Sequence, residues 1–277
     1  MNEAPNAGQA AYWNDATGPT WAELQPMLDR QLDPLGRLAM DALAPAPGEH
    51  ILDIGCGAGS TSLELAGRVS PGGEVLGADI SGTLLAVARR RAEGRPGVSF
   101  VEADAQTHDF TPHSFDAVFS RFGVMFFADP TAAFANIRRA LKPGGRLAFV
   151  CWRSPAESPL MTLPQMAAAP PLPPAEPPPP PGPGPFAFAD PERVRTILAG
   201  AGFTDAAVTP QDLKTGSGDL DTSVMLSLRV GPLGGRLREH PEQREAVIDA
   251  VRQALAQHDT PEGVKMTAGV WVVTARA

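Results

Sequence analysis

The sequence predicts an α/β fold built on a doubly wound, mostly parallel sheet. Between residues 50 and 210, short apolar runs of strand character alternate with runs of helical character. This alternation is typical of βαβ units, in which helices connect parallel strands. A glycine-rich turn follows the first strand, and doubly wound sheets bind their ligands at the carboxyl ends of the strands. We therefore expect the functional site at that edge.

The predicted strands are short apolar runs. They are expected at residues 50–54, 74–79, 98–102, 115–120, 146–151 and 203–209. Helices are expected between them at residues 60–69, 81–93, 131–141 and 191–201. The runs 71–73 and 142–145 combine proline with glycine and are predicted as turns that lead into strands. The apolar, β-branched run 266–275 is predicted as a seventh strand.

Three regions stand outside this alternation and are predicted to cover the carboxyl edge of the sheet. Helices are expected at 21–43 and 241–258. Eleven prolines lie between residues 170 and 185, and because proline lacks a backbone donor we expect that stretch to be extended and mobile. The expected parts of one compact domain are an N-terminal cap (1–46), the core (47–151), a proline-rich lid (152–189), a core helix and strand (190–210), a helical insertion (211–264) and the final strand (265–277).

Composition and charge narrow the function classes. The chain has 277 residues, 43% of them hydrophobic, which suffices for one sizeable core. A formal net charge of -8 without a Lys/Arg stripe argues against a nucleic-acid partner. Two cysteines give neither a disulfide framework nor a zinc spacing, so no metal is expected. The N-terminus has no leader pattern and no apolar run approaches about 18 residues. These features favour a cytoplasmic monomer or homodimer with a small-molecule partner.

The turn after the first predicted strand distinguishes between two ligand classes. A dinucleotide-binding turn requires the pattern G-x-G-x-x-G. In the two possible registers of this chain, Ser60 and Ser62 occupy the third glycine position. The pattern that fits is acidic-x-Gly-x-Gly-x-Gly, which begins at Asp53. A carboxylate at that place suits a ligand that brings an amino group or a cation, and it repels a pyrophosphate.

This pattern resembles the first motif of the class I methyltransferases that use S-adenosylmethionine (SAM). Four further motifs follow in the order of that family, namely Asp79 and Asp104 at strand ends, the segment 115–130, and the run 141–145 before the fifth strand. The resemblance covers residues 50–151. It implies a Rossmann-like sheet of six parallel strands plus an antiparallel last strand beside the sixth, with a helical and proline-rich cap. It also implies SAM as the cofactor.

The resemblance also implies roles for individual residues at the cofactor. The Asp79 carboxylate, 24 residues after Gly55, would accept both ribose hydroxyls, whereas the alternative is that Asp79 or Ser81 caps the next helix. Asp104 would accept a hydrogen bond from the adenine amino group, or would be an ordinary loop aspartate. The implied cofactor residues are Trp13, Asp53, Gly55, Cys56, Gly57, Asp79, Ile80, Asp104, Ala105 and Ser120.

The acceptor side of the site is less well defined. Through the segments 12–14, 121–127 and 151–153, the chain is similar to the small-molecule branch that includes the ubiquinone and menaquinone C-methyltransferases. Either of two arginines could bind an anionic acceptor or polarise an oxygen, although Arg121 could equally form a salt bridge at the rim. No catalytic base is identified. The acceptor-side candidates are Trp13, Arg121, Phe122, Trp152 and Arg153.

The sequence predicts an enzyme that moves a methyl group from SAM to a small, partly apolar metabolite by in-line displacement. Because the sulfonium is already activated, holding the nucleophile about 3 Å from the methyl group supplies much of the rate. One alternative is a non-catalytic SAM-binding scaffold or sensor that keeps the same residues. The other is a nicotinamide-dependent oxidoreductase, which the missing third glycine and the position of Asp53 disfavour.

Overall fold

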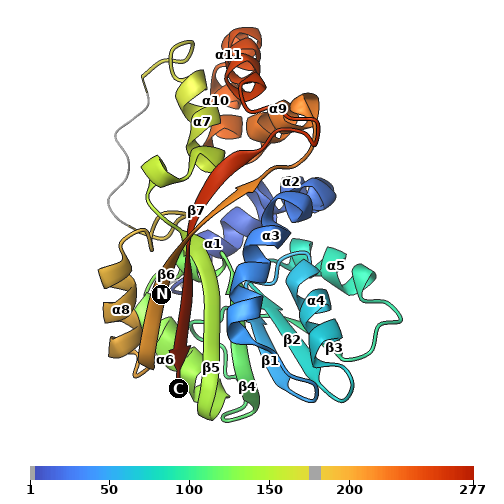
Figure 1. Ribbon diagram of the computed structural model, residues 1–277, viewed down its shortest axis with the longest axis vertical. Helices are drawn as coiled ribbons and strands as arrows, with labels where there is room; N and C mark the ends of the chain where they lie inside the picture. Colours follow the sequence, from blue (N-terminus) through green and yellow to red (C-terminus); the bar gives the residue numbers. More distant parts are fainter. Residues whose placement is uncertain (1–3, 175–181) are drawn as a thin grey trace.

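The computed structural model describes residues 4–174 and 182–277. Its centre is a seven-stranded sheet with the strand order β3-β2-β1-β4-β5-β7-β6 (Figure 1). Strands β1 to β5 pair in parallel, and β7 pairs antiparallel with both β5 and β6. This confirms the six parallel strands and the antiparallel last strand beside the sixth. The strands are β1 (His50–Ile54), β2 (Glu74–Asp79), β3 (Val98–Glu102), β4 (Phe115–Arg121), β5 (Leu141–Trp152), β6 (Thr204–Thr215) and β7 (Met266–Arg276).

The central strands are buried because helices cover both faces of the sheet. Leu52 in β1 and Phe119 in β4 are both 0% exposed. Helices α3 and α4 lie over one face, and α6 packs on the other face next to α8 (Figure 1). The helices around the sheet are α3 (Gln25–Leu43), α4 (Ser60–Val69), α5 (Gly82–Arg91), α6 (Pro130–Ala140) and α8 (Pro191–Gly200).

Side-chain caps fix the starts of two of these helices. Asp129 accepts a hydrogen bond from the Ala132 N–H at 3.0 Å before α6, and Asp190 accepts one from the Glu192 N–H at 2.9 Å before α8. Proline follows each cap, where its missing N–H would have had no helical partner. The sequence predicts both helices to within one residue.

Two strand boundaries differ from the sequence prediction. β5 begins at Leu141 rather than at 146, because Leu141 pairs with Phe115 ahead of a bulge. The turn predicted at 142–145 is this bulge. β6 continues to Thr215, past the predicted end at 209, because β7 pairs with it over its whole length. The resulting β6–β7 ribbon runs beyond the core of the sheet (Figure 1).

Four helices gather at the far end of this ribbon, above the carboxyl edge of the sheet (Figure 1). We call them the cap: α7 (Pro159–Ala168), α9 (Leu220–Arg229), α10 (Pro232–Glu239) and α11 (Arg244–Ala256). Helices α7 and α9 both pack against α11. The insertion thus holds three helices where the sequence predicts only one, at 241–258. The start of α9 carried a signal that the prediction missed, since Asp219 accepts a hydrogen bond from the Thr222 N–H at 2.8 Å.

The N-terminal region is mostly helical and joins the sheet to the cap. The helix predicted at 21–43 is divided at Leu24 into two helices. Leu24 and Leu28 pack against Leu226 of α9, which links this region to the cap. Before α3 come α1 (Ala7–Ala11), a π-helical turn (Tyr12–Ala16) and α2 (Gly18–Glu23).

The predicted mobile, extended stretch at 170–185 can be compared with the structure only at its ends, because residues 175–181 lie outside the described residues. Just before it, α7 forms inside the predicted lid, with Pro159 at its first turn. Within the described ranges, no helix is long and apolar enough to cross a membrane. The same ranges hold no group of three or more His, Cys, Asp or Glu side chains that could bind a metal ion.

Candidate cofactor site

The three glycines of the turn between β1 and α4 all have left-handed backbones, but they serve different purposes. Their φ angles are +68° at Gly55, +54° at Gly57 and +82° at Gly59. A Cβ at Gly55 would lie 2.7 Å from Cα of Gly123, and one at Gly59 would lie 2.9 Å from Cβ of Ala88. These two glycines are therefore required by packing of the protein against itself.

Gly57 differs because it faces open space. The nearest described atom to a Cβ at this position would be Cδ1 of Leu84, at 3.9 Å. Its N–H donates to Oδ2 of Asp79 at 2.7 Å. The backbone at Gly57 is thus bare, and it adjoins a carboxylate at the end of the neighbouring strand. This is the arrangement expected of a turn that a ligand touches.

Asp79 lies at the carboxyl end of β2 and is only 9% exposed. Burial raises the pKa of its carboxyl group, and backbone N–H donors from Ser81, Gly57 and Ile80 act in the opposite direction. The Ser81 N–H donates to Oδ1 of Asp79 at 2.8 Å. Ser81 caps α5 with its own hydroxyl, which accepts from the Leu84 N–H at 3.2 Å. Asp79 is therefore not needed as the helix cap, and its carboxylate has remaining lone pairs for a ligand.

Asp53 is completely buried beneath the first turn of α4. Its Oδ2 accepts hydrogen bonds from the hydroxyls of Thr61 and Ser62, both at 2.6 Å. Its Oδ1 is buried and has no hydrogen-bond partner among the described residues. Burial raises the pKa of Asp53 to about 6, while the two hydroxyls lower it. An unpaired buried carboxylate oxygen costs stability unless a donor reaches it, so it suits a ligand with an amino group.

Asp104 follows β3 and is held by a side chain that the sequence analysis did not identify. The Asn6 Nδ2 donates to both carboxylate oxygens of Asp104, at 2.9 and 3.0 Å. The backbone N–H of Gln106 donates to Oδ1 of Asp104 at 2.9 Å. The next residue, Ala105, is buried. Asn6 stands in no recognisable motif, and its partner is 98 positions away in the chain, so no local signal pointed to it.

Residues 4–17, which we call the strap, lie along the ends of β2 and β3. The carbonyl oxygen of Trp13 accepts from the Ser81 hydroxyl at 2.8 Å, and Asn14 Nδ2 donates to the carbonyl of Ile80 at 3.2 Å. The Trp13 ring stands edge-on to Phe126, with 5.4 Å between centroids. The strap therefore spans the positions at which the resemblance puts ribose and adenine.

Residues 52–149, which contain this glycine turn and both strand-end aspartates, match the family model described as a methyltransferase domain. The chain carries a methyltransferase domain. A demethylmenaquinone methyltransferase of Clavibacter sepedonicus is 37% identical over 149 residues, covering 53% of this chain and 60% of that protein. One of Thermus thermophilus is 48% identical over 113 residues, covering 40% of this chain and 50% of that protein. The chain thus spans about half to three-fifths of the length of these curated relatives.

A solved structure shares the fold of the whole sheet. Haemonchus contortus phosphoethanolamine N-methyltransferase 2 in complex with SAM aligns with a TM-score of 0.53 at 21% identity, over 87% of this chain and 52% of that one. A likeness at this level of identity concerns the fold. It supports the Rossmann-like arrangement of the sheet, while the methyltransferase assignment rests on the family match over residues 52–149.

Both predicted acceptor-side arginines are engaged in ion pairs. Arg121 is bonded to Asp33 of α3, and its side chain is 13% exposed. This contact is the alternative that the sequence left open for Arg121, namely a salt bridge at the rim. Arg153 is bonded to Glu157 and, at 2.9 Å, to Asp212. Since both guanidinium groups already hold carboxylates, we do not carry them forward as acceptor ligands.

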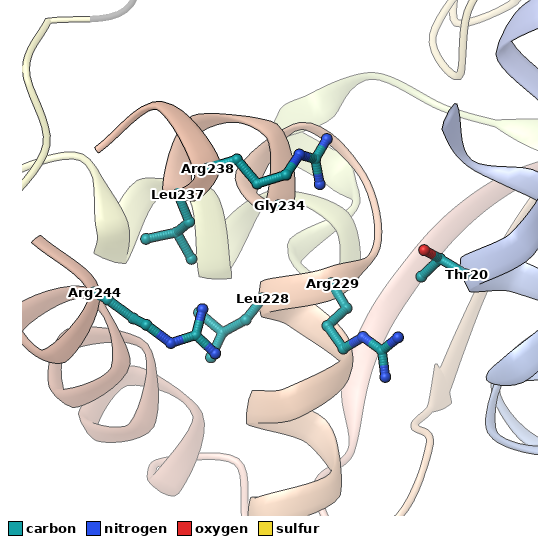
Figure 2. Close-up of a pocket in the computed structure, with 7 residues that line it drawn as sticks. All are labelled: Thr20, Leu228, Arg229, Gly234, Leu237, Arg238 and Arg244. Atoms are coloured by element: carbon teal, nitrogen blue, oxygen red, sulfur yellow. The ribbon is translucent and has the colours of Figure 1, made fainter. Parts of the chain in front are cut away.

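A separate hollow opens between the cap and α2, with a volume of about 320 Å³. Figure 2 shows the side chains of Arg229 and Arg238 reaching from the cap toward Thr20. Arg229 is paired with Glu23 at 2.8 Å. No predicted cofactor residue of the methyltransferase domain lines this hollow, so we do not assign it to the cofactor.

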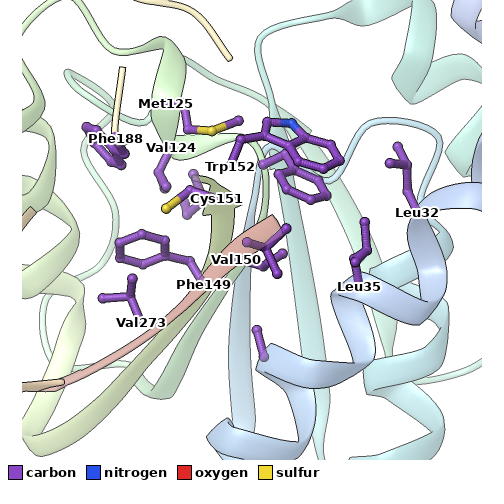
Figure 3. Packing of buried hydrophobic residues seen from close by; sticks show 14 of the residues in the cluster. Leu32, Leu35, Val124, Met125, Phe149, Val150, Cys151, Trp152, Phe188 and Val273 are labelled. Carbon is purple, nitrogen blue, oxygen red and sulfur yellow. The ribbon is translucent and has the colours of Figure 1, made fainter. Parts of the chain in front are cut away.

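Two aromatic acceptor-side candidates stack on each other. Phe122 and Trp152 lie with 4.4 Å between ring centroids and 10° between ring planes. Phe122 has a φ of +61°, a strained backbone for a bulky residue, of the kind that concentrates at functional sites. Trp152 stands at the end of β5 and belongs to the same buried cluster as Phe149 and Cys151 (Figure 3).

The two remaining cofactor candidates are buried and act through packing or backbone contacts. Ser120 is 0% exposed, and its hydroxyl accepts from the Gly123 N–H at 3.2 Å, which shapes the loop that contacts Gly55. Cys56 is 1% exposed, and burial raises the pKa of its thiol well above the usual value. Neither side chain is placed for chemistry, because a buried neutral thiol is a poor nucleophile.

Proposed function

We propose that this chain transfers a methyl group from SAM to a small, partly apolar metabolite. The observation that carries the proposal is the open backbone at Gly57, which lies beside the Asp79 carboxylate in the turn that also buries the unpaired oxygen of Asp53. These features provide an acceptor for hydroxyl groups, a counterpart for an amino group, and room for a ligand to touch the main chain.

The residues present fit the cofactor in three places. The Asp79 carboxylate would hold the ribose hydroxyls, and the charge of Asp53 beneath the turn would attract the amino group of the methionine part. Asp104 and the backbone of Ala105 would bind adenine, with Ile80 against the ring. When bound, SAM supplies a methyl group that is already activated by its sulfonium charge.

The protein's own contribution to the reaction is positioning. A site that holds the two reacting atoms about 3 Å apart and in line can lower the barrier by roughly 7–11 kcal/mol. Aromatic faces also stabilise a sulfonium cation, and the Trp13 ring of the strap stands edge-on to the ring of Phe126. Cap and strap together would keep water from the carboxyl edge of the sheet. No general base enters the proposal.

For the acceptor, we propose a flat, partly apolar ring system of the quinone type. Two similar proteins are named demethylmenaquinone methyltransferases. The parallel stack of Phe122 and Trp152 at the ends of β4 and β5 agrees with this, because flat aromatic surfaces favour flat ligands. Because both rings of the stack are mostly buried, an acceptor would contact the edge of the pair and not its faces.

An assay of S-adenosylhomocysteine release tests the proposal. The purified chain would be incubated with SAM and a panel of acceptors that includes demethylmenaquinone, a hydroxylated naphthalene, an aliphatic amine and a fatty acid. We expect product release with the flat ring acceptors and background release with the aliphatic ones. Turnover confined to the aliphatic acceptors would contradict the acceptor class. Tight SAM binding without release for any acceptor would favour the non-catalytic scaffold or sensor.

A further inference from the structure

Asn6 makes a fully satisfied, buried contact between distant segments. The residue is 4% exposed. Its Nδ2 donates to both oxygens of Asp104 and to Oε1 of Gln106, at 2.9, 3.0 and 3.1 Å. Its Oδ1 accepts from the Ala128 N–H at 2.8 Å. One carboxamide thus joins the strap to the loop after β3 and to the loop before α6.

The strap has a second attachment at the end of β2. There, Trp13 and Asn14 are hydrogen-bonded to Ser81, to the carbonyl of Ile80 and to Thr83. Between the two attachments the chain passes over the strand ends that carry Asp79 and Asp104. A segment tied at both ends across these strand ends controls access to them. Each end makes four hydrogen bonds among the described residues, but Asn6 is the buried one and donates to a carboxylate, which makes stronger hydrogen bonds than a neutral acceptor, so the Asn6 end limits the opening.

The Asn6 contact does not use up the hydrogen-bonding capacity of Asp104. A carboxylate offers about four lone-pair positions. Asn6 and the backbone N–H of Gln106 occupy three of them. One position remains for an amino group, so the strap can stay closed while Asp104 binds a further donor. The geometry thus fits a gate that closes over the ligand better than a plug that excludes it.

We propose that Asn6 is the latch of the cofactor cleft: SAM and its product enter and leave only when the bond between Asn6 and Asp104 opens. This inference rests on the proposed cofactor site. Asn6 is a positioning residue that acts on cofactor exchange through the strap. Its loss therefore changes the rates of exchange more than the affinity.

The test compares cofactor exchange rates in the wild type and the Asn6→Ala variant. Stopped-flow tryptophan fluorescence is suited to it, because Trp13 and Trp21 lie in or next to the strap with their rings 5.3 Å apart. We expect the association and dissociation rate constants for S-adenosylhomocysteine each to rise by about tenfold or more, with a change in Kd of about threefold or less. Asn6→Asp, which puts a carboxylate against Asp104, should accelerate exchange at least as much.

Asn136→Ala is the matched control. Asn136 of α6 holds the same loop from the other side, donating to the carbonyl oxygens of Ala105 and His108 at 3.0 and 2.8 Å. If loosening of the loop were the cause, both variants would accelerate exchange equally, and that result would overturn the latch. Unchanged rates in Asn6→Ala, or weaker binding through slower association, would overturn it as well. A wild type that binds no SAM would instead refute the proposed function.

Discussion

At the scale of single residues, the site combines groups that are costly to keep in a folded protein. Asp53 is buried with one oxygen unpaired, and Phe122 has a left-handed backbone. Gly55, Gly57 and Gly59, in a segment of five residues, all have positive φ angles. Local strain and buried charge of this kind are retained at functional sites at the expense of stability. The predictions at this scale separate residues that serve the ligand from residues that serve the fold.

Replacing Asp53 by asparagine should stabilise the protein at neutral pH. Burial raises the pKa of Asp53 from 3.8 to about 6, so between these values the folded state holds a proton that the unfolded state releases. The stability that this proton supplies is present below about pH 4 and is lost as the pH rises through about 6. We expect Asp53→Asn to exceed the wild type in unfolding free energy by roughly 1–3 kcal/mol at pH 8, with no advantage at pH 4.

Chemical denaturation at both pH values measures this difference. Other titrating groups are shared by the two proteins and cancel in the comparison. A variant that is less stable than the wild type at pH 8 would show that the carboxylate contributes to the fold. Calorimetry on the same variant should show weaker SAM binding.

Asp79 should matter for the cofactor far more than for the fold. In Asp79→Ala the ribose hydroxyls would lose a charged acceptor, which is worth roughly 2–3 kcal/mol of binding free energy. Isothermal titration with SAM measures the change. Affinity within about twofold of the wild type would remove Asp79 from the site.

The glycines of the turn give a matched pair of variants. Gly57→Ala places a Cβ in open space at a φ of +54°, so it should cost roughly 1–2 kcal/mol of stability from backbone strain and should block SAM. Gly55→Ala forces a Cβ to within 2.7 Å of Gly123, so it should disrupt folding. Thermal melts and SAM titration distinguish the two. A stable Gly57→Ala protein that binds SAM normally would rule out ligand contact at that position.

At the scale of elements, the sequence was most informative where an element stands beside a clear turn. The bounds of β1, β2, β3 and α4 match the prediction, because glycine or proline turns mark where these short runs begin or end. The extension of β6 was not predictable, since its outer half is held by pairing with β7 rather than by an apolar pattern. The contacts of Asn6 were not predictable either, because its partners become neighbours only in the folded chain.

The contact between the start of α7 and β7 gives a prediction at this scale. The Ser158 hydroxyl, just before α7, donates to the carbonyl oxygen of Gly269 at 2.9 Å, and a Cβ at Gly269 would clash with the backbone of Glu157. Gly269→Ala should therefore loosen α7 while leaving SAM affinity within about twofold. Hydrogen exchange should be faster in residues 159–168 and unchanged in β1. Equal protection of α7 in both proteins would show that the stability of this helix does not depend on the contact.

At the scale of the whole molecule, the sheet separates two tasks. The strands β1 to β4 end in the residues assigned to the cofactor, while the β6–β7 ribbon carries the cap that covers the same edge (Figure 1). The family match covers residues 52–149 and leaves the strap and the cap outside. The same fold serves many chemistries, so the cofactor follows from the core, whereas the acceptor depends on those covering parts.

Calorimetric titration of the purified chain with SAM, alongside NAD, tests the central claim most directly. The open Gly57 and the carboxylates beside its turn predict saturable, one-to-one binding of SAM. They also predict no detectable heat of binding with NAD, whose pyrophosphate would approach the turn next to Asp53 of β1 and Asp79 of β2. Binding of NAD in preference to SAM, or no binding of SAM by a folded protein, would contradict the account.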